Sequence, residues 1–308
     1  MTFRFYFRIG VAPNTVQQRK IYEMSQEDSR IFKGSVDRYN GITVSSQKEP
    51  CSSADFPIVL SESMNRWKTN NVRGVWFKVF LKHADWVPIL AQNGFTFHHA
   101  KQEYVMMCKW LPTNGDVCNI PYYAHTMVGV GAVVINNLEE ILVVREKYYK
   151  NPHWKLPGGY VEPGEDIVNA AMREVKEETA IETKFHSIIA FRHTHGIQFG
   201  CSDIYFIVSL APLSQNIVKC DREIVACQWM KVQDFVCHPE VIETNKNFVK
   251  TFLDYRSSGI QITCERNKHP VLGRNQCIFN ATLTVDEKDS PVTENDKPQK
   301  TDREVSSS

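Results

Sequence analysis

Three glutamates lie within five residues of the chain, at Glu174, Glu177 and Glu178, and their type and spacing suit the binding of a metal ion. At about 100° per residue, a helix places Glu174 and Glu178 on one face and Glu177 on its flank. Carboxylates at this spacing repel by roughly 0.2–0.5 kcal/mol per pair, so helix formation alone does not favour the cluster. A hard divalent cation does favour it, because Mg²⁺ takes oxygen ligands and completes its shell with water and phosphate oxygens.

An alternative interpretation is that segment 173–178 (REVKEE) is a solvated helix face with alternating charges and no metal role. A longer pattern favours the chemical interpretation. Gly159 is followed by Glu165 six residues later, and Arg173-Glu174 follow after eight and nine more. Arg173 is expected to hold a carboxylate by a bidentate ion pair, with Glu165 as its partner. The arginine and the acids therefore belong to one pattern that spans a loop and a helix.

This pattern resembles the Nudix box, G-x5-E-x7-R-E-U-x-E-E-x-G-U, in which U is an aliphatic residue. The chain matches it at Gly159, Glu165, Arg173, Glu174, Val175, Glu177, Glu178 and Ile181. One position departs, because Ala180 stands where the family has a glycine that ends the helix in a left-handed conformation. Alanine in that conformation is expected to cost about 1 kcal/mol. The departure removes no charged group.

The resemblance implies an α/β fold in which a Nudix α/β/α sandwich carries the box as loop, helix and loop. It implies that Glu174, Glu177 and Glu178 bind Mg²⁺ or Mn²⁺, and that Glu177, Glu178 and Arg173 serve catalysis. Gly159 and Glu165 are then structural. The implied reaction is hydrolysis of a diphosphate bond in a nucleoside diphosphate derivative, which yields a nucleoside monophosphate and a second phosphate-bearing fragment.

Related enzymes often recruit a further carboxylate from a downstream loop, and Glu223 is the candidate here for a base or an extra metal ligand. A surface loop acid without a role is the alternative, because loop position alone assigns no function. His193 and His195 share one side if their strand continues, where they could contact substrate; a plain loop position is again the alternative.

Segments outside the box extend the resemblance to one subfamily of Nudix proteins. VRGVWFKVFL, GFTFHHA, YAHTMVGVGAVV and CSDIYFIV resemble a subfamily that includes the antisense basic fibroblast growth factor protein of animals and the ADP-ribose and NADH pyrophosphatases of plants. ADP-ribose or NADH is favoured as substrate through the plant relatives alone. The resemblance leaves a homodimer open. The competing hypothesis is a non-catalytic regulator on a Nudix scaffold that senses a nucleotide or binds a protein, motivated by Ala180 and the extra domain.

The elements that must position these residues form two α/β units. We expect a disordered leader over residues 1–38, a smaller α/β domain over 39–115, a Nudix domain over 122–260 and a disordered tail over 281–308. In the second domain, strands at 127–135 and 141–145 flank Asn136-Asn137, a hairpin-type signal, and a helix follows from 165 to about 178. In the first, the adjacent His98 and His99 are expected on opposite faces of a strand, which makes them a poor chelating pair.

Composition limits the remaining functions. Lysine plus arginine (36) nearly balance aspartate plus glutamate (35), so the chain has no global field to hold DNA. Nine cysteines without a CxxC pair argue against a disulfide framework and a structural zinc site, and favour a reducing compartment. No apolar run approaches the roughly 20 residues of a membrane helix. The basic, aromatic first 20 residues suit a mitochondrial presequence or an ordinary leader, so we expect an intracellular location, cytoplasmic or mitochondrial.

Overall fold

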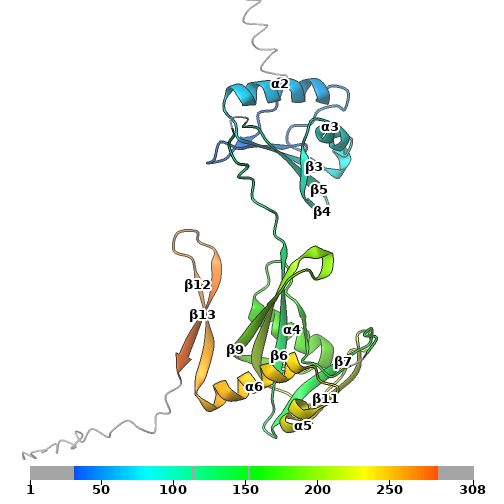
Figure 1. Ribbon diagram of the computed structural model, residues 1–308, viewed down its shortest axis with the longest axis vertical. Helices are drawn as coiled ribbons and strands as arrows, with labels where there is room; N and C mark the ends of the chain where they lie inside the picture. The colour runs from blue at the N-terminus through cyan, green and yellow to red at the C-terminus, as the bar shows by residue number, and fades with distance from the viewer. Residues whose placement is uncertain (1–30, 113–114, 152, 284–308) are drawn as a thin grey trace, which may run out of the picture. The chain divides into compact units, whose positions relative to one another are not determined.

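Residues 31–112, 115–151 and 153–283 are described by a computed structural model, in which the chain divides into two compact units between Ala124 and His125 (Figure 1). Residues 1–30 of the predicted leader and 284–308 of the predicted tail lie outside the described residues. Among the described residues, no helix combines the length and apolar character needed to cross a membrane.

In the described part of the first unit, a five-stranded sheet carries two α-helices. The strand order is β1-β2-β3-β5-β4, and β2 runs parallel to β3 while the other neighbours are antiparallel. Helix α2 makes the crossover between β2 and β3; it has a proline in its first turn and basic side chains in its last, both favourable positions. The elements are β1 (Ser35–Val36), β2 (Ile42–Ser45), α2 (Phe56–Thr69), β3 (Gly74–Phe80), α3 (Trp86–Gln92), β4 (Thr96–Lys101) and β5 (Tyr104–Trp110).

Aromatic side chains dominate the core of this unit. Alternate residues of β3 are buried, and Phe77 meets the rings of Phe32, Phe56 and Trp86. Phe56 and Trp86 stack with their ring centroids 4.1 Å apart, which joins the two helices. Because Phe32 is only 4% exposed and residues 35–36 already pair in the sheet, the folded part of the unit begins before residue 39.

The prediction that His98 and His99 point to opposite faces is wrong. A β-bulge interrupts the pairing of β4 with β5 between Phe97 and His99, which removes the simple alternation of side chains. The two Nδ1 atoms lie 2.7 Å apart, and His98 Nε2 lies 2.8 Å from the carbonyl oxygen of Pro121. His99 also stacks on Tyr123 at 4.6 Å. The pair therefore ties the end of this unit's chain to its own sheet.

The second unit contains a four-stranded sheet of order β8-β6-β10-β9 and a two-stranded sheet of β11 and β7. Strands β6 and β10 are parallel, and the other pairs are antiparallel. A third sheet, the hairpin of β12 and β13, lies beyond the boundary that the sequence indicated at residue 260 and was not predicted. The elements are β6 (Thr126–Val134), β7 (Glu140–Glu146), β8 (Gly158–Tyr160), α4 (Ile167–Thr179), β9 (Thr183–Thr194), β10 (Ser202–Pro212), β11 (Ile224–Lys231), α5 (Val232–Cys237), α6 (Glu243–Ser257), β12 (Ile260–Lys268) and β13 (Asn275–Leu283).

Helices cover both faces of the second unit's strands, which confirms the predicted α/β/α sandwich (Figure 1). On β6, Val130 and Val134 pack with the buried face of α4, whereas Val133 packs with residues of α5 and α6. The prediction of a hairpin around Asn136-Asn137 is wrong, because β6 and β7 do not form a continuous pair of strands. Beyond one bridge, β6 pairs with β8 and β10 while β7 pairs with β11, so the turn leads from one sheet to another.

Candidate active site

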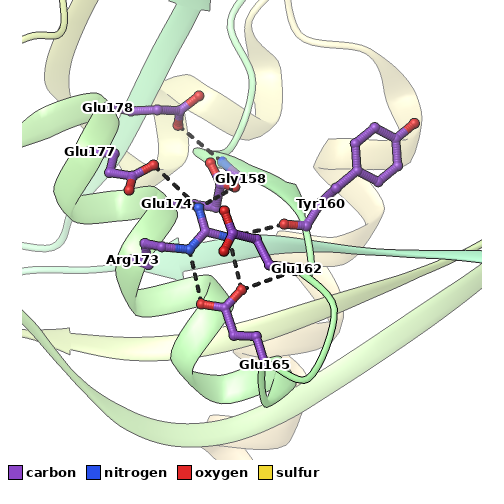
Figure 2. Close-up of polar contacts among 8 residues, drawn as sticks. All are labelled: Gly158, Tyr160, Glu162, Glu165, Arg173, Glu174, Glu177 and Glu178. Atoms are coloured by element: carbon purple, nitrogen blue, oxygen red, sulfur yellow. Dashed lines mark hydrogen bonds and ion pairs between the residues drawn. The ribbon is translucent and has the colours of Figure 1, made fainter. Parts of the chain in front are cut away.

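Helix α4 carries the acids of the site. It follows a turn at Gly164 and begins at Ile167, and its buried residues Val168, Ala171 and Val175 form an apolar face against the sheet. Since residues three and four apart share a side of a helix, the glutamates line the neighbouring flank, toward the short strand β8. Figure 2 shows the side chains of Glu178 and Arg173 directed toward β8, at Gly158 and Tyr160.

The end of α4 confirms the expectation for Ala180. This residue has φ 58° and ψ 12°, the left-handed conformation, and its N–H donates to the carbonyl oxygen of Lys176 at 2.8 Å. The geometry that the family's glycine would adopt is therefore kept, at the expected backbone cost of about 1 kcal/mol. Ile181 is fully buried directly after it, which holds the chain in this turn.

Arg173 is the centre of the polar network (Figure 2). Its guanidinium donates to both oxygens of Glu165 at 2.9 and 3.0 Å, so the expected bidentate pair is present. It also donates to Glu174 at 2.9 Å, to Glu177 at 3.2 Å and to the carbonyl oxygen of Tyr160 at 3.0 Å. One planar cation thus fixes the loop before α4 and two of the helix acids in one arrangement.

Two adjacent glycines let the chain approach the acids closely. The N–H of Gly158 donates to Glu178 Oε2 at 3.0 Å, and a Cβ at Gly158 would lie 2.1 Å from the Val130 carbonyl oxygen. At Gly159, a Cβ would lie 2.5–2.7 Å from the carboxylate of Glu174. A side chain fits at neither position without displacing a neighbour. At the glycine that opens the box, a side chain would therefore displace the Glu174 carboxylate from its observed position.

The environment sets the protonation of these groups. Burial raises the pKa of Glu178 from 4.5 to about 8, and the carboxylates of Glu174 and Glu146 add to the rise, while Lys155 and the Gly158 N–H oppose it. Burial also raises the pKa of Glu174, against the opposing effect of Arg173. The pKa of Glu165 is lowered by its hydrogen bonds from Arg173. For Glu178 and Glu174, the effect of burial on the pKa therefore outweighs the effect of the nearby positive charge and hydrogen bonds.

An all-oxygen cation site fits these residues by its chemistry. Glu178 is 5% exposed and the Glu174 side chain 15%, and the carboxylate of Glu174 disfavours the charge of Glu178. Within the described residues, no three His, Cys, Asp or Glu side chains are grouped closely enough to hold a metal. Mg²⁺ commonly uses one or two carboxylates and takes water and phosphate for the rest, so Glu174 and Glu178 suffice as donors. The Glu177 carboxylate, 56% exposed, is turned to Arg173.

The loop before β11 brings Glu223 to this group. Cys220 N–H donates to the carbonyl oxygen of Glu178 at 3.0 Å, which seats the loop on the end of α4. The carboxylate of Glu223 is then close enough to contribute to the raised pKa of Glu174. By contrast, His193 and His195 contact each other, with ring centroids 4.3 Å apart. Neither histidine lines the pocket described next, which opens beside Gly158 and Gly159.

A pocket of about 280 Å³ opens beside Gly158 and Gly159. The charged side chains in its wall had no role predicted from the sequence; they are Glu146, Lys155, Arg192 and Asp203. Lys155 pairs with Glu146, and Arg192 donates to Asp203 at 2.8 Å. One feature of the sequence could have indicated this part of the site: Asp203 is a single acid at the start of the apolar run DIYFIV.

Both units match known families. Residues 32–111 match the profile described as Nudix hydrolase domain, and residues 125–252 match the profile described as NUDIX domain. Nudix hydrolase 2 of Arabidopsis thaliana is 39% identical over 222 residues, which cover 71% of this chain and 79% of that protein. Nudix hydrolase 8 of the same plant is 37% identical, and the match covers 73% of this chain and 62% of the relative's length.

Further similarities extend to animals and to solved structures. The human protein named Nucleoside diphosphate-linked moiety X motif 6 is 35% identical over 210 residues, or 66% of each chain. The structure of a NUDIX hydrolase from Nitrosomonas europaea has 23% sequence identity and a TM-score of 0.38, and covers 42% of this chain and 89% of that one. At these values the structural likeness supports no conclusion about activity.

Proposed function

The chain belongs to the Nudix hydrolase family, and from that premise we propose that it hydrolyses the diphosphate bond of a nucleoside diphosphate derivative with Mg²⁺ as cofactor. The observation that carries the proposal is that two carboxylates, of the buried Glu178 and the half-buried Glu174, lie against Gly158 and Gly159 of β8. Of the neighbouring cations, Lys155 pairs with Glu146, and Arg173 divides its hydrogen bonds among Glu165, Glu174 and Glu177. A site of this kind favours a divalent ion together with an anionic ligand.

Each residue of the network has a separate task in this proposal. Glu174 and Glu178 would hold the ion, joined by Glu177 when it leaves Arg173. When bound, a divalent ion supplies charge neutralisation for the diphosphate and a more acidic attacking water. Glu223 would accept a proton from the attacking water as its oxygen bonds to phosphorus and the P–O bond to the leaving phosphate group breaks. Arg173 and Glu165 hold the acids in position.

The favoured substrates are ADP-ribose and NADH. They are supported by the resemblance to the plant ADP-ribose and NADH pyrophosphatases. Cleavage of ADP-ribose at its diphosphate would release AMP and ribose 5-phosphate, since one water adds across one P–O bond. The ligand in every case is a small nucleotide.

A nucleotide panel tests the proposal. Purified full-length protein is assayed for AMP release from ADP-ribose, NADH and related dinucleotides with Mg²⁺, with Mn²⁺ and with EDTA. We expect turnover only with metal, loss of about 100-fold or more in Glu178→Gln, and ordinary activity in Glu243→Gln, a change at an exposed acid of α6. Glu223→Gln should lower kcat and leave metal affinity nearly unchanged.

The opposite result would favour the regulatory hypothesis. Saturable binding of ADP-ribose or NADH without hydrolysis at any metal concentration would indicate a sensor on a Nudix scaffold. Equal, slow turnover by the wild type and Glu178→Gln would likewise reject the catalytic proposal.

A further inference from the structure

The pair of Arg192 and Asp203 is unusual among the ion pairs of the described residues. Asp203 is 4% exposed, and its Oδ2 accepts a hydrogen bond from Arg192 at 2.8 Å. Its other oxygen, Oδ1, is buried and has no hydrogen-bond partner within the described part of the chain. An ionised carboxylate seldom keeps a buried oxygen unpaired, because lost solvation costs about 1–3 kcal/mol or more. The free oxygen therefore calls for a partner that the chain itself does not supply.

Asp203 stands in the wall of the pocket beside the acids of α4. The same wall contains Gly158, whose N–H donates to Glu178, so the pocket adjoins the proposed metal-binding carboxylates. Its volume of about 280 Å³ suits one ring of a nucleotide better than a whole dinucleotide, since pockets for larger ligands reach about 300–1,000 Å³.

Tyr205 lies between Gly158 and Arg192, the partner of Asp203. Its side chain packs closely on two glycines: a Cβ at Gly129 would lie 2.7 Å from a ring carbon, and a Cβ at Gly131 would lie 2.7 Å from the hydroxyl oxygen. A Cβ at Gly158 would lie 2.9 Å from the tyrosine hydroxyl, which places that hydroxyl at this glycine. Arg192 covers the ring, with its guanidinium carbon 5.1 Å from the ring centroid. The tyrosine is thus fixed, and the arginine beside it is held in turn by Asp203.

The charges of the pocket indicate which part of a nucleotide it accepts. Besides His153, its wall holds two acids and two cationic side chains, and each cation pairs with an acid, so little positive charge is left for a phosphate. Tyr149, Tyr160 and Phe248 add aromatic surface. A neutral ring with a hydroxyl or amine donor matches both features, because aromatic walls accept the ring and a carboxylate oxygen accepts the donor.

Building on the proposed function, we infer that Asp203 is a specificity-determining residue: its Oδ1, which neighbouring side chains cover in this structure, is uncovered when a nucleotide enters the pocket and accepts a hydrogen bond from a hydroxyl or amine on the ribose or base next to the diphosphate. Arg192 is a positioning residue that orients the carboxylate. A purely structural pair across β9 and β10 would leave the free oxygen unexplained, whereas a ligand donor satisfies it.

Asparagine at position 203 provides the central test. Its amide oxygen can still accept from Arg192, which leaves an NH₂ donor where the ligand's donor must sit. We compare wild type and Asp203→Asn for equilibrium binding of ADP-ribose in EDTA by calorimetry, and for kcat/KM with metal. Loss of a hydrogen bond to a charged group should weaken both by about 10- to 100-fold, mainly through KM.

Ligand analogues identify the donor. ADP-ribose analogues that lack one group are used: 2′-deoxyadenosine for the adenosine sugar, a deoxy terminal ribose for the other sugar, and hypoxanthine in place of adenine. For the analogue that lacks the recognised donor, wild type and Asp203→Asn should differ by less than about 3-fold. The matched control is Glu140→Gln, which breaks the cross-strand pair with Lys231 outside the pocket and should not discriminate among the ligands.

The outcomes separate this inference from the proposed function. Binding in EDTA does not require hydrolysis, so Asp203 can be assessed even if no metal supports turnover. Equal loss across all ligands in Asp203→Asn, as for a merely structural pair, would overturn the inference. So would unchanged affinity, or failure of wild-type protein to bind any nucleotide of the panel in EDTA.

Discussion

Replacing Glu178 by glutamine should stabilise the metal-free protein at alkaline pH while it removes activity. Burial raises the pKa of this carboxyl from 4.5 to about 8. A group with a raised folded-state pKa contributes stability that is fully present below the unfolded pKa and is lost as pH rises through the folded pKa. The second unit should therefore lose stability between about pH 4.5 and pH 8, and glutamine, which does not ionise, should not.

The magnitude follows from the same shift. A rise from 4.5 to about 8 corresponds to an upper limit of about 5 kcal/mol. Local relaxation and water entry reduce this limit, and we expect roughly 1–3 kcal/mol at pH 8.5. Glutamine keeps a carbonyl oxygen that can accept the hydrogen bond from the Gly158 N–H, so this donor is not left unpaired. For a unit of this size the gain equals roughly 2–12 °C in the melting temperature.

Calorimetry in EDTA from pH 5 to pH 9 provides the assay, with Glu182→Gln as the control. Glu182 forms an exposed pair with Lys176, and such pairs contribute little to stability. The advantage of Glu178→Gln should be near zero at pH 5 and should grow toward pH 8.5. A variant less stable than wild type at pH 8.5, or one with the wild-type dependence on pH, would refute the reasoning.

Three further substitutions test the geometry of the box. Ala180→Gly should raise the free energy of unfolding by about 1 kcal/mol with activity kept, because the residue has φ 58°. Gly159→Ala should lower activity at least about 10-fold and raise the metal concentration required, since its Cβ would lie 2.5 Å from the Glu174 carboxylate, as a metal titration would show. Arg173→Lys should lower kcat by about 10- to 100-fold, since an ammonium cannot make the bidentate pair with Glu165, as steady-state kinetics would show.

Matched changes make these results specific. Ala170→Gly, in the interior of α4, should destabilise by about 1 kcal/mol, in the direction opposite to Ala180→Gly. Gly74→Ala, where a Cβ has no atom nearer than 3.4 Å, should leave the metal requirement unchanged. A destabilising Ala180→Gly, or a Gly159→Ala variant with wild-type metal dependence, would contradict the geometry described above.

Local rules determined the elements and part of the site from sequence alone. The helix over the box, the left-handed turn at Ala180 and the pairing of Arg173 with Glu165 depend on spacing along one helix and its two ends. Groups this close in sequence have few other ways to meet. The two-unit organisation was likewise evident, because a stretch with Pro112, Asn114-Gly115 and Pro121 cannot continue a strand or helix.

Only the tertiary structure decided which distant groups share an environment. The sequence suggested a β6-β7 hairpin, but each strand satisfies its backbone in a different sheet, and a bulge brings His98 to His99. The raised pKa of Glu178 depends on burial that no local pattern reports. Asp203 and Arg192 both line the pocket because β9 pairs with β10. Gly158 and Gly159, which line the same pocket, come more than 30 residues earlier in the chain. Spacing fixes neighbours within one helix, whereas burial and strand pairing depend on the packing of the whole unit.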